Sequence, residues 1–320
     1  MEQRKLIKFG GSSFVLSLPN HWLKKNKLKK GDILYLEESS EGNIVMSPSI
    51  KEDSEISVIN IDADNKSFER IAREIFSAYT NNYSLIKITG KNLRAIVKRI
   101  RRILHSFVAL EIVEEDDKKI IAKDFLNLKD VSVNDNIRRM DIILRGMMQD
   151  MVRCVYDNCS DSIYERDFDI NKFCFLILRV INGTIENPSI IKSLGIKNGD
   201  LIPTWLLAIH LEEIGDEIKR VSRFLSVHKL DDKMKNEIQI MLTNTEKLYL
   251  DAMKAYYTKN YELAFAVDIK KDSLIEQCTS IFEKYPNIGV GVILERLKKM
   301  ISGVGSVAQI VYGGGIRRRD

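Results

Sequence analysis

The sequence predicts a multidomain protein with three kinds of structure in succession: a small β domain, a small α+β domain of ferredoxin-like type, and an all-α part built from tandem three-helix bundles. Three observations lead to this prediction. Short apolar runs broken by turn residues fill residues 1–50, a β-α-β-α-β-β pattern follows, and apolar residues keep helical spacing from Asp135 onward. With 320 residues, the chain is long enough for about two to three domains.

Residues 1–50 form the first predicted domain. Gly10 and Gly11 separate two short strands and favour a hairpin turn. Asn20 is placed to cap a short helix, and Gly31 lies in a turn before two further strands. The apolar residues that define these elements are Leu6, Phe9, Phe14, Leu16 and Leu18 in the hairpin, Trp22, Leu23 and Leu28 around the helix, and Ile33, Tyr35, Ile44 and Met46 in the later strands.

The order of elements in this domain resembles the AbrB/SpoVT/MazE-type swapped-hairpin domain. The shared pattern is a basic strand, a Gly-Ser turn, a second strand ending in Leu-Pro at 18–19, a short helix and a Leu-x-x-Gly-Asp run at 28–32. A domain of about fifty residues buries too little surface to be stable alone. The resemblance implies that two chains exchange hairpins and form an obligate homodimer through this domain.

The same segment is basic, because residues 1–36 contain eight Lys or Arg residues and two acidic residues. In the family that it resembles, the basic strands approach DNA, and serine hydroxyls at the turn can bond to phosphate. The resemblance therefore implies DNA contacts from Arg4, Lys5, Lys8, Ser12 and Ser13. Two plainer interpretations remain open: these side chains only solvate a surface, or the domain serves only for dimerisation.

Residues 54–128 form the second predicted domain, a two-layer α+β domain. Strands are expected at 56–61, 85–88, 109–114 and 118–122, and helices at 67–79 and 91–107. The second of these helices is strongly basic through Arg94, Lys98, Arg99, Arg101 and Arg102. Such a run is either a solvated helix face or a surface for an anionic partner, meaning DNA that flanks the first domain or an acidic protein.

Residues 132–228 and 231–315 form two predicted helical repeats. Helices are expected around 137–151, 173–180 and 203–224 in the first repeat, and at 234–257, 261–284 and 291–312 in the second. Each has an apolar stripe at helical spacing. Three long helices followed by three more indicate two stacked antiparallel bundles.

Pairs of carboxylates four residues apart occur in both repeats: Glu212 with Asp216, and Asp268 with Asp272. Residues four apart share a helix face, where like charges repel. Each pair therefore requires solvent, a cationic partner or a metal ion. Oxygen ligands that project from neighbouring helices are the way in which carboxylate metal sites are built in bundles.

The helical part resembles the PhoU family of phosphate-uptake regulators, whose two three-helix repeats carry E/D-x-x-x-D motifs that can hold metal clusters. The run L-E-E-I-G-D at 211–216 is similar to the family's Leu-Glu-Arg-Ile-Gly-Asp, and E-R-D-F-D-I-N at 165–171 lies where a further carboxylate pair is expected. The last helix carries L-E-R-L-K-K at 294–299. The resemblance implies divalent or iron-type metal ions at Asp167, Glu212, Asp216, Asp268, Asp272 and Glu295.

Both repeats depart from that family pattern, because Asn171 and Lys299 stand where a second carboxylate is expected. An amide oxygen can still bind a metal weakly, whereas Lys299 is expected to neutralise Asp268 or Asp272 instead. A polar bundle face held by ion pairs is therefore the alternative to a metal site. An AbrB-type domain joined to a PhoU-type body resembles an arrangement found in archaeal regulators.

Other classes of protein receive little support. The longest apolar run, 173–178, ends at Arg179 and is too short to cross a bilayer, and Met1 leads into charged residues without a secretion signal. The cysteines at 154, 159, 174 and 278 show no CxxC spacing and are expected to be reduced in a cytoplasmic protein. Because phosphate-binding glycine loops and Glu-x-x-His pairs are absent from the sequence, we do not expect an enzyme.

The resemblances together predict a dimeric, DNA-binding transcriptional regulator of phosphate uptake, in which the helical body senses or relays phosphate status. One alternative is a protein-interaction regulator of a phosphate-transporter ATPase or a sensor kinase, with the first domain serving only for dimerisation. A second alternative is a metal-binding helical bundle.

Overall fold

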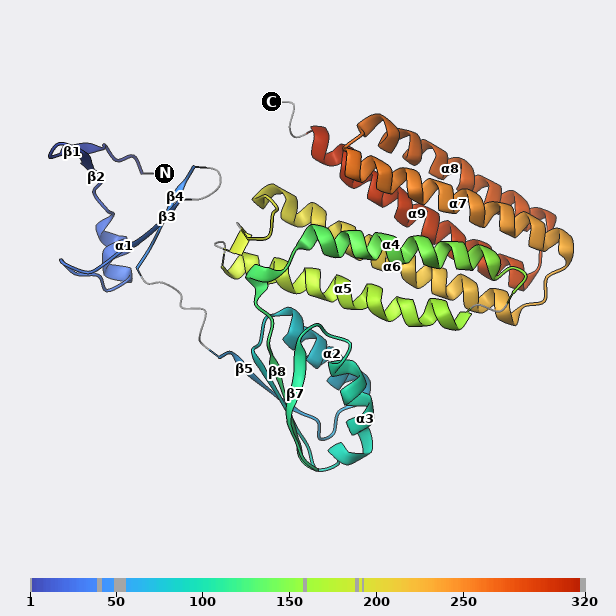
Figure 1. The fold of residues 1–320 in the computed structure, drawn as a ribbon, viewed down its shortest axis with the longest axis horizontal. Coiled ribbons are helices and arrows are strands. Elements are labelled where there is room, and N and C mark those ends of the chain that lie inside the picture. Colours follow the sequence, from blue (N-terminus) through green and yellow to red (C-terminus); the bar gives the residue numbers. More distant parts are fainter. Residues whose placement is uncertain are drawn as a thin grey trace. The chain divides into compact units, whose positions relative to one another are not determined.

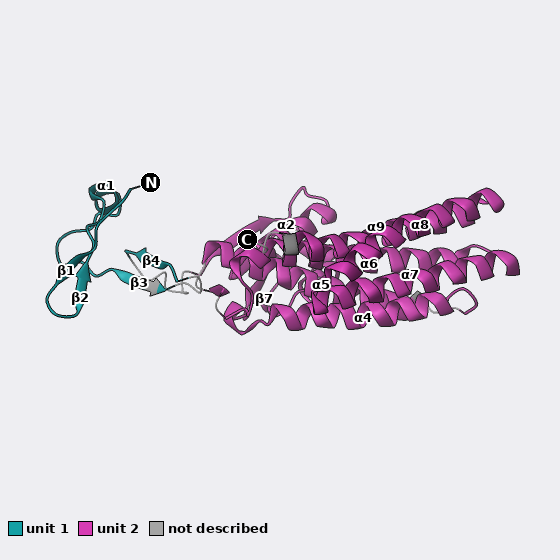
Figure 2. Ribbon diagram, turned by 90° about the horizontal axis from the view of Figure 1, so that it is seen from above, with its two compact units in different colours: residues 1–55 teal, residues 56–320 magenta. Residues whose placement is uncertain are grey.

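The structure, a computed structural model, describes residues 2–38, 42–48, 56–157, 160–187, 190–191 and 193–316. The chain divides into two compact units, Met1–Glu55 (unit 1) and Ile56–Asp320 (unit 2), which Figure 2 shows in different colours. The predicted α+β domain and the predicted helical repeats thus belong to one unit.

Unit 1 contains two antiparallel hairpins with a short helix between them. Strands β1 (Ile7–Phe9) and β2 (Ser13–Val15) form the first hairpin, and β3 (Tyr35–Glu38) and β4 (Ile44–Ser47) form the second. Helix α1 (Asn20–Lys25) follows β2. Asn20 is its first helical residue and Pro19 precedes it without a side-chain cap, so the expected Asn20 cap is wrong by one position. The apolar side chains expected around α1 are half-buried.

The first part of unit 2 is a two-layer α+β structure. It contains β5 (Val58–Asp62), α2 (Phe68–Thr80), β6 (Leu85–Thr89), α3 (Leu93–Leu104), β7 (Leu110–Glu115) and β8 (Lys119–Asp124), in the predicted order. The strand order in the sheet is β5-β6-β8-β7, with β5 parallel to β6 and the pairs β6–β8 and β7–β8 antiparallel.

This connectivity corrects the expected ferredoxin-like type. A ferredoxin-like chain has the order βαββαβ, in which the strands of a βαβ unit are split by another strand. Here β5 and β6 are direct neighbours, and the last two strands form a hairpin that adds to β6 through β8. The strand preferences of the residues give the elements, but the partner of each strand depends on contacts between distant residues.

The second part of unit 2 is helical (Figure 1). Its helices are α4 (Val133–Arg153), α5 (Ser160–Glu186), α6 (Leu201–Val227), α7 (Asp232–Thr258), α8 (Tyr261–Lys284) and α9 (Ile288–Ile316). Side-chain caps fix several of the helix starts, because Ser132, Asp231 and Asn260 accept hydrogen bonds from backbone N–H groups of the first turns of α4, α7 and α8. The three-helix sets α4–α6 and α7–α9 correspond to the two predicted repeats.

The two three-helix sets share one hydrophobic core, which runs without interruption from Val131 to Val311. A polar contact also joins them inside the core: the Tyr249 hydroxyl of α7 donates a 2.9 Å hydrogen bond to Asp141 of α4, which is 3% exposed. Arg145 donates two further bonds of 2.9 Å to the same carboxylate. The buried charge is therefore fully paired, as burial requires.

Helix α5 carries the contact between the α+β layers and the helical body. Phe175 of α5 packs against Phe76 of α2 and against Phe107, with ring centroids 4.8 and 5.9 Å apart. Near these rings, Arg179 forms an ion pair with Asp124 at the end of β8. The α+β layers are thus fixed to the helical body by an aromatic cluster and a buried charge pair.

Cys154, just after α4, is disulfide-bonded, which corrects the expectation of a reduced thiol at that position. Cysteines at spacings other than CxxC can form a disulfide wherever the fold brings their Cα atoms within about 7 Å. Cys174 and Cys278 are free and buried, whereas Cys159 lies outside the described residues. In the described part of the chain, no helix combines the length and apolar content needed to cross a membrane.

Candidate functional site

The predicted DNA-contacting residues lie on and beside the first hairpin of unit 1. The strand register pairs Lys8 with Phe14 and Phe9 with Ser13. Directly paired residues share a face of a hairpin, so Lys8 and Ser13 lie on opposite faces. Ser12 lies in the turn. The side chains of all five predicted residues are exposed.

The charges of this hairpin have few partners within the chain. Arg4 donates a 2.6 Å hydrogen bond to Glu2, and both side chains are exposed, so water competes strongly with this contact. Lys5 and Lys8 form no ion pair with any residue that the structure describes. These ammonium groups are therefore available to an anionic partner.

Unit 1 also has a large uncovered apolar surface. Among its described side chains none is buried, which leaves the unit without a core of its own. Large apolar side chains that are more than half exposed are Leu6, Ile7, Phe9, Phe14, Ile33, Leu36, Ile44 and Val45. Apolar surface of this extent is unfavourable in water, and it is typical of a face that another chain covers.

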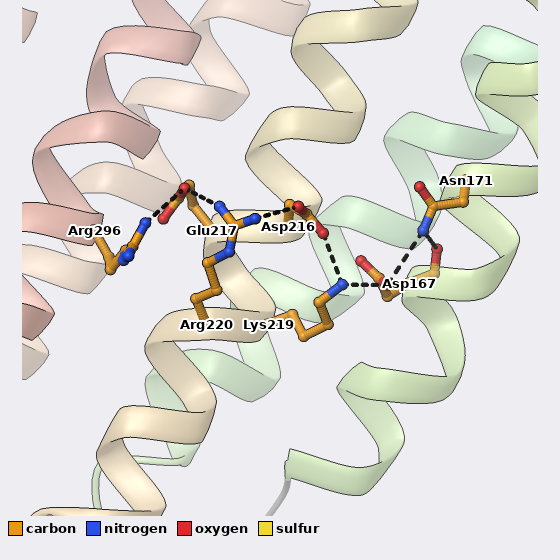
Figure 3. Close-up of polar contacts among 7 residues, drawn as sticks. All are labelled: Asp167, Asn171, Asp216, Glu217, Lys219, Arg220 and Arg296. Carbon is orange, nitrogen blue, oxygen red and sulfur yellow. Dashed lines mark hydrogen bonds and ion pairs between the residues drawn. The ribbon is translucent and has the colours of Figure 1, made fainter. Parts of the chain in front are cut away.

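The predicted carboxylate site of the first repeat is a network of ion pairs between α5 and α6 (Figure 3). The Lys219 ammonium donates hydrogen bonds of 2.6 Å to Asp167 and 2.7 Å to Asp216, and it lies between the two carboxylates. Asn171 turns its amide nitrogen toward Asp167, at 3.3 Å from Oδ2 and 3.0 Å from the backbone oxygen. Lys219 and Asn171 thus both donate hydrogen bonds to the Asp167 carboxylate.

The network continues across α6 to α9. Arg220 donates to Asp216 at 2.7 Å and to Glu217 at 2.5 Å, and Arg296 of α9 approaches Glu217 at 3.5 Å (Figure 3). Glu217 is buried, and its Oε2 atom has no hydrogen-bond partner among the described residues. The chain of alternating charges thereby connects both three-helix sets.

Protonation within the network follows from burial. Burial raises the pKa of Asp167 even though Lys219 opposes the shift. Burial lowers the pKa of Lys219, but its hydrogen bonds to both carboxylates outweigh burial and the net shift is upward. Glu212 forms no hydrogen bond with the described residues, and burial together with repulsion from Asp216 and Asp167 raises its pKa to about 7. The Glu212 carboxyl therefore changes its protonation near neutral pH.

The structure does not gather the predicted residues of the second repeat into one site. Lys271 pairs with Asp268 at 2.9 Å and approaches Asp272 at 3.5 Å, and the Tyr312 hydroxyl donates to Asp268 at 3.1 Å. Asp268 lies opposite Gly305 of α9.

Glu295 is ten residues before that position, or about 15 Å along the helix, and pairs with Lys298 at 2.9 Å. The expectation that Lys299 neutralises Asp268 or Asp272 is wrong. Lys271 of α8 lies beside both carboxylates on their own helix, whereas Lys299 lines a groove between α6 and α9.

The side chains as they lie do not fit a bound metal ion. The Lys219 ammonium occupies the position between Asp167 and Asp216, and Asn171 presents its nitrogen rather than its oxygen. Within the described ranges, no group of three or more His, Cys, Asp or Glu residues is arranged to hold a metal ion. The arrangement fits the ion-paired bundle face that was the alternative interpretation.

The cations that complete these networks were missed in the sequence, although their spacing was visible. Lys219 and Arg220 follow Asp216 by three and four residues, and Lys271 follows Asp268 by three. Pairs at these spacings meet on a helix surface. Counting cations together with carboxylates along each helix would have found them.

Comparison with known proteins identifies one part of the chain. The model of a family described as "Antidote-toxin recognition MazE, bacterial antitoxin" matches residues 7–62, which include nearly all of unit 1 and extend through β5. The chain therefore carries a MazE/AbrB-type domain, the class of domain that the hairpin pattern and the basic strand predicted, and this agrees with DNA-binding regulation. No curated protein and no solved structure matches the chain. The likeness of residues 132–315 to PhoU regulators rests on the sequence motifs alone.

Proposed function

We propose that this protein is a homodimeric transcriptional regulator that binds DNA through unit 1. The observation that carries the proposal is the exposed basic run of Arg4, Lys5 and Lys8: Lys8 lies in the segment that matches the antitoxin family, residues 7–62, and Arg4 and Lys5 come just before it. Contacts from lysine and arginine to phosphate supply most of the affinity of such surfaces. The serine hydroxyls at the turn add hydrogen bonds to phosphate and fix the register on DNA.

The homodimer is proposed from the apolar surface of unit 1. Unit 1 has eight large apolar side chains that are more than half exposed, and none of its described side chains is buried. Such a surface needs a partner, and a second copy of the same segment offers a matching one. Dimerisation would also double the number of basic strands. This increases affinity and the salt dependence of DNA binding.

The helical body is proposed to sense or relay phosphate status, and the support for this part is the likeness of its motifs to PhoU regulators. The single shared core of α4–α9 and the charge network through α5, α6 and α9 connect distant parts of the body. Genome-wide capture of DNA bound to the intact protein tests this part: enrichment upstream of phosphate-transport genes supports it, and enrichment elsewhere contradicts it.

DNA binding is tested by fluorescence anisotropy with a mixed-sequence duplex at several salt concentrations. The variant R4A/K5A/K8A should bind more weakly, and its plot of log affinity against log salt should be shallower by about 0.9 for each phosphate that the variant leaves unneutralised. The matched control, K247Q/K254Q/K270Q, removes three exposed charges from α7 and α8 and should bind like the unaltered protein. Unchanged affinity in R4A/K5A/K8A would falsify the assignment.

A protein-interaction role is the second candidate, because unit 1 exposes a large apolar surface that suits a contact with protein. In this case unit 1 would dimerise only, and the body would dock on a partner such as a transporter ATPase or a sensor kinase. Retention of a transporter subunit by the purified protein, without salt-dependent DNA binding, would favour this candidate.

A further inference from the structure

Helix α3 presents a face of positive charge to solvent. The helix contains no acidic residue, and Arg94, Lys98 and Arg102 follow one another at intervals of four, so that they lie in one row. All three side chains are exposed, whereas the apolar residues of α3 pack against the core of the α+β layers. We refer to Arg94, Lys98 and Arg102 as the α3 row.

The acidic residues next to α3 are already paired with other cations of the same helix. Arg101 forms two hydrogen bonds to Glu115, of 2.8 and 2.5 Å, and Arg99 pairs with Glu69 at 3.3 Å. The α3 row forms no ion pair with any residue that the structure describes. Within the described residues, its charges therefore remain uncompensated.

The α3 row is unfavourable for the isolated helix, because like charges four residues apart repel one another. No contact in the described fold offsets this repulsion, whereas a polyanion would attract all three cations and so outweigh it. The row extends about 12 Å, from eight residues at about 1.5 Å each. Duplex DNA carries about one negative charge per 1.7 Å of its axis, so a straight row of this length faces several phosphates.

We propose that the α3 row is a second DNA-contacting surface, which binds the phosphate backbone beside the segment held by unit 1. This inference rests on the proposed function of unit 1. Contacts with phosphate carry no sequence information, so the row would add affinity and leave sequence preference unchanged. Because both surfaces belong to one chain, binding at one raises the effective concentration of DNA at the other.

DNA suits the α3 row better than an acidic protein does. The core of a protein interface is rich in apolar and aromatic side chains, with arginines packed among them. The exposed positions of α3 are Arg94, Ala95, Lys98, Arg99, Arg101 and Arg102, and none of them is aromatic or a large apolar residue. A row of cations without such side chains is typical of binding to a nucleic-acid backbone.

The test uses the full chain and a mixed-sequence duplex of several helical turns, between about 50 and 200 mM salt. The variant R94Q/K98Q/R102Q keeps good helix formers and leaves the pairs of Arg99 and Arg101 intact. We expect binding weaker by about tenfold or more at the lowest salt, with a salt slope shallower by up to about 2.7 per chain, or 0.9 for each of three phosphates. The K247Q/K254Q/K270Q control and the variant R94K/R102K, which keeps all three charges of the row, should both retain the original slope.

The outcome separates this inference from the proposed function when R4A/K5A/K8A is measured in parallel. Loss of binding in both triple variants supports both surfaces. Loss of DNA binding in R4A/K5A/K8A alone overturns the α3 row as a DNA-contacting surface and leaves the proposed function standing. The same holds if R94Q/K98Q/R102Q keeps its DNA binding but loses binding to an acidic protein. Loss in R94Q/K98Q/R102Q alone supports the row and contradicts unit 1 as the DNA-binding surface. An unaltered chain that binds no DNA overturns both.

Discussion

Arg179 of α5 and Asp124 at the end of β8 form a two-bond ion pair that is almost fully enclosed. The two hydrogen bonds are 3.0 and 2.5 Å long, and the arginine is 2% exposed. Burial raises the pKa of Asp124, and the neighbouring guanidinium opposes that shift. Arg179 also lies over the ring of Tyr79 at 4.5 Å. This ion pair joins the α+β layers to the helical body, two parts that the sequence predicted as separate domains.

Replacing Arg179 by Ala should lower the free energy of unfolding by about 3 to 5 kcal/mol, because it leaves the Asp124 carboxylate buried without a partner. Urea denaturation followed by circular dichroism measures this change. The control, Arg70→Ala, removes an exposed pair with Glu74 and should cost less than about 1 kcal/mol. The double variant D124L/R179L should be more stable than Arg179→Ala, and equal or lower stability would contradict the explanation.

Replacing Lys219 by Met should destabilise the helical body, since Asp167 is 5% exposed and would face Asp216 without a cation between them. Lys219 is itself partly exposed, so we expect a loss of about 2 kcal/mol at neutral pH. The loss should shrink as the pH falls, because protonation removes the unpaired charge of Asp167. Thermal unfolding at pH 8 and pH 5 checks this, and the control is Lys298→Met, which removes a pair with the exposed Glu295. A loss independent of pH would count against the charge explanation.

The network should hold no stoichiometric metal ion, because an ammonium group occupies the space between its carboxylates. Elemental analysis of protein purified without a chelator measures this directly, with D167N/D216N as the control. A divalent or iron-type ion present in the unaltered protein and lost from D167N/D216N would overturn this interpretation of the network.

Replacing Glu212 by Gln should stabilise the protein at alkaline pH and have little effect in acid. The folded-state pKa of about 7 lies above the ordinary value of 4.5, so the folded state binds this proton more tightly than the unfolded state does. The stability that Glu212 contributes is therefore present below pH 4.5 and is lost as the pH rises to 7. For a half-buried group we expect a gain of about 1 to 2 kcal/mol in the variant at pH 8. Thermal unfolding of the variant and of the unaltered protein from pH 4 to pH 8 tests this prediction. Plots of melting temperature against pH that run parallel for the two proteins would refute it.

The double variant I7D/V15D should disrupt the proposed homodimer, because Ile7 and Val15 are cross-strand partners and are 58% and 41% exposed. Light scattering after size exclusion gives the mass of the particle in solution. Ile269→Asp is a matched control in α8, at a residue that is 74% exposed, and it should leave the mass unchanged. A variant that keeps the dimer mass would show that the apolar hairpin is not the dimer contact.

Much of the helical part could be predicted from the sequence, because apolar spacing and capping residues act locally. The helix expected at 261–284 has those bounds in the structure, and Asn260 provides its cap. The pairing of the strands could not be predicted in the same way. The place of β6 between β5 and β8 is decided by packing between residues far apart in sequence.

The candidate sites were likewise predictable only where they depend on local sequence. The basic strand could be predicted, because charge and length are properties of a short segment. The partners of the carboxylates were not, although Lys219 lies only three residues after Asp216. Its second contact, Asp167, is in another helix, and only the packing of α5 on α6 brings them together. Lys299 was assigned to the wrong carboxylates for the same reason.

The uninterrupted core of α4–α9 has a consequence for the assembly of this body. A chain that ended after α6 would leave bare the apolar sides of α4 and α6 that α7 and α9 cover. Because α7–α9 belong to the same chain, they cover these sides at any protein concentration, whereas a separate partner would do so only near or above its dissociation constant.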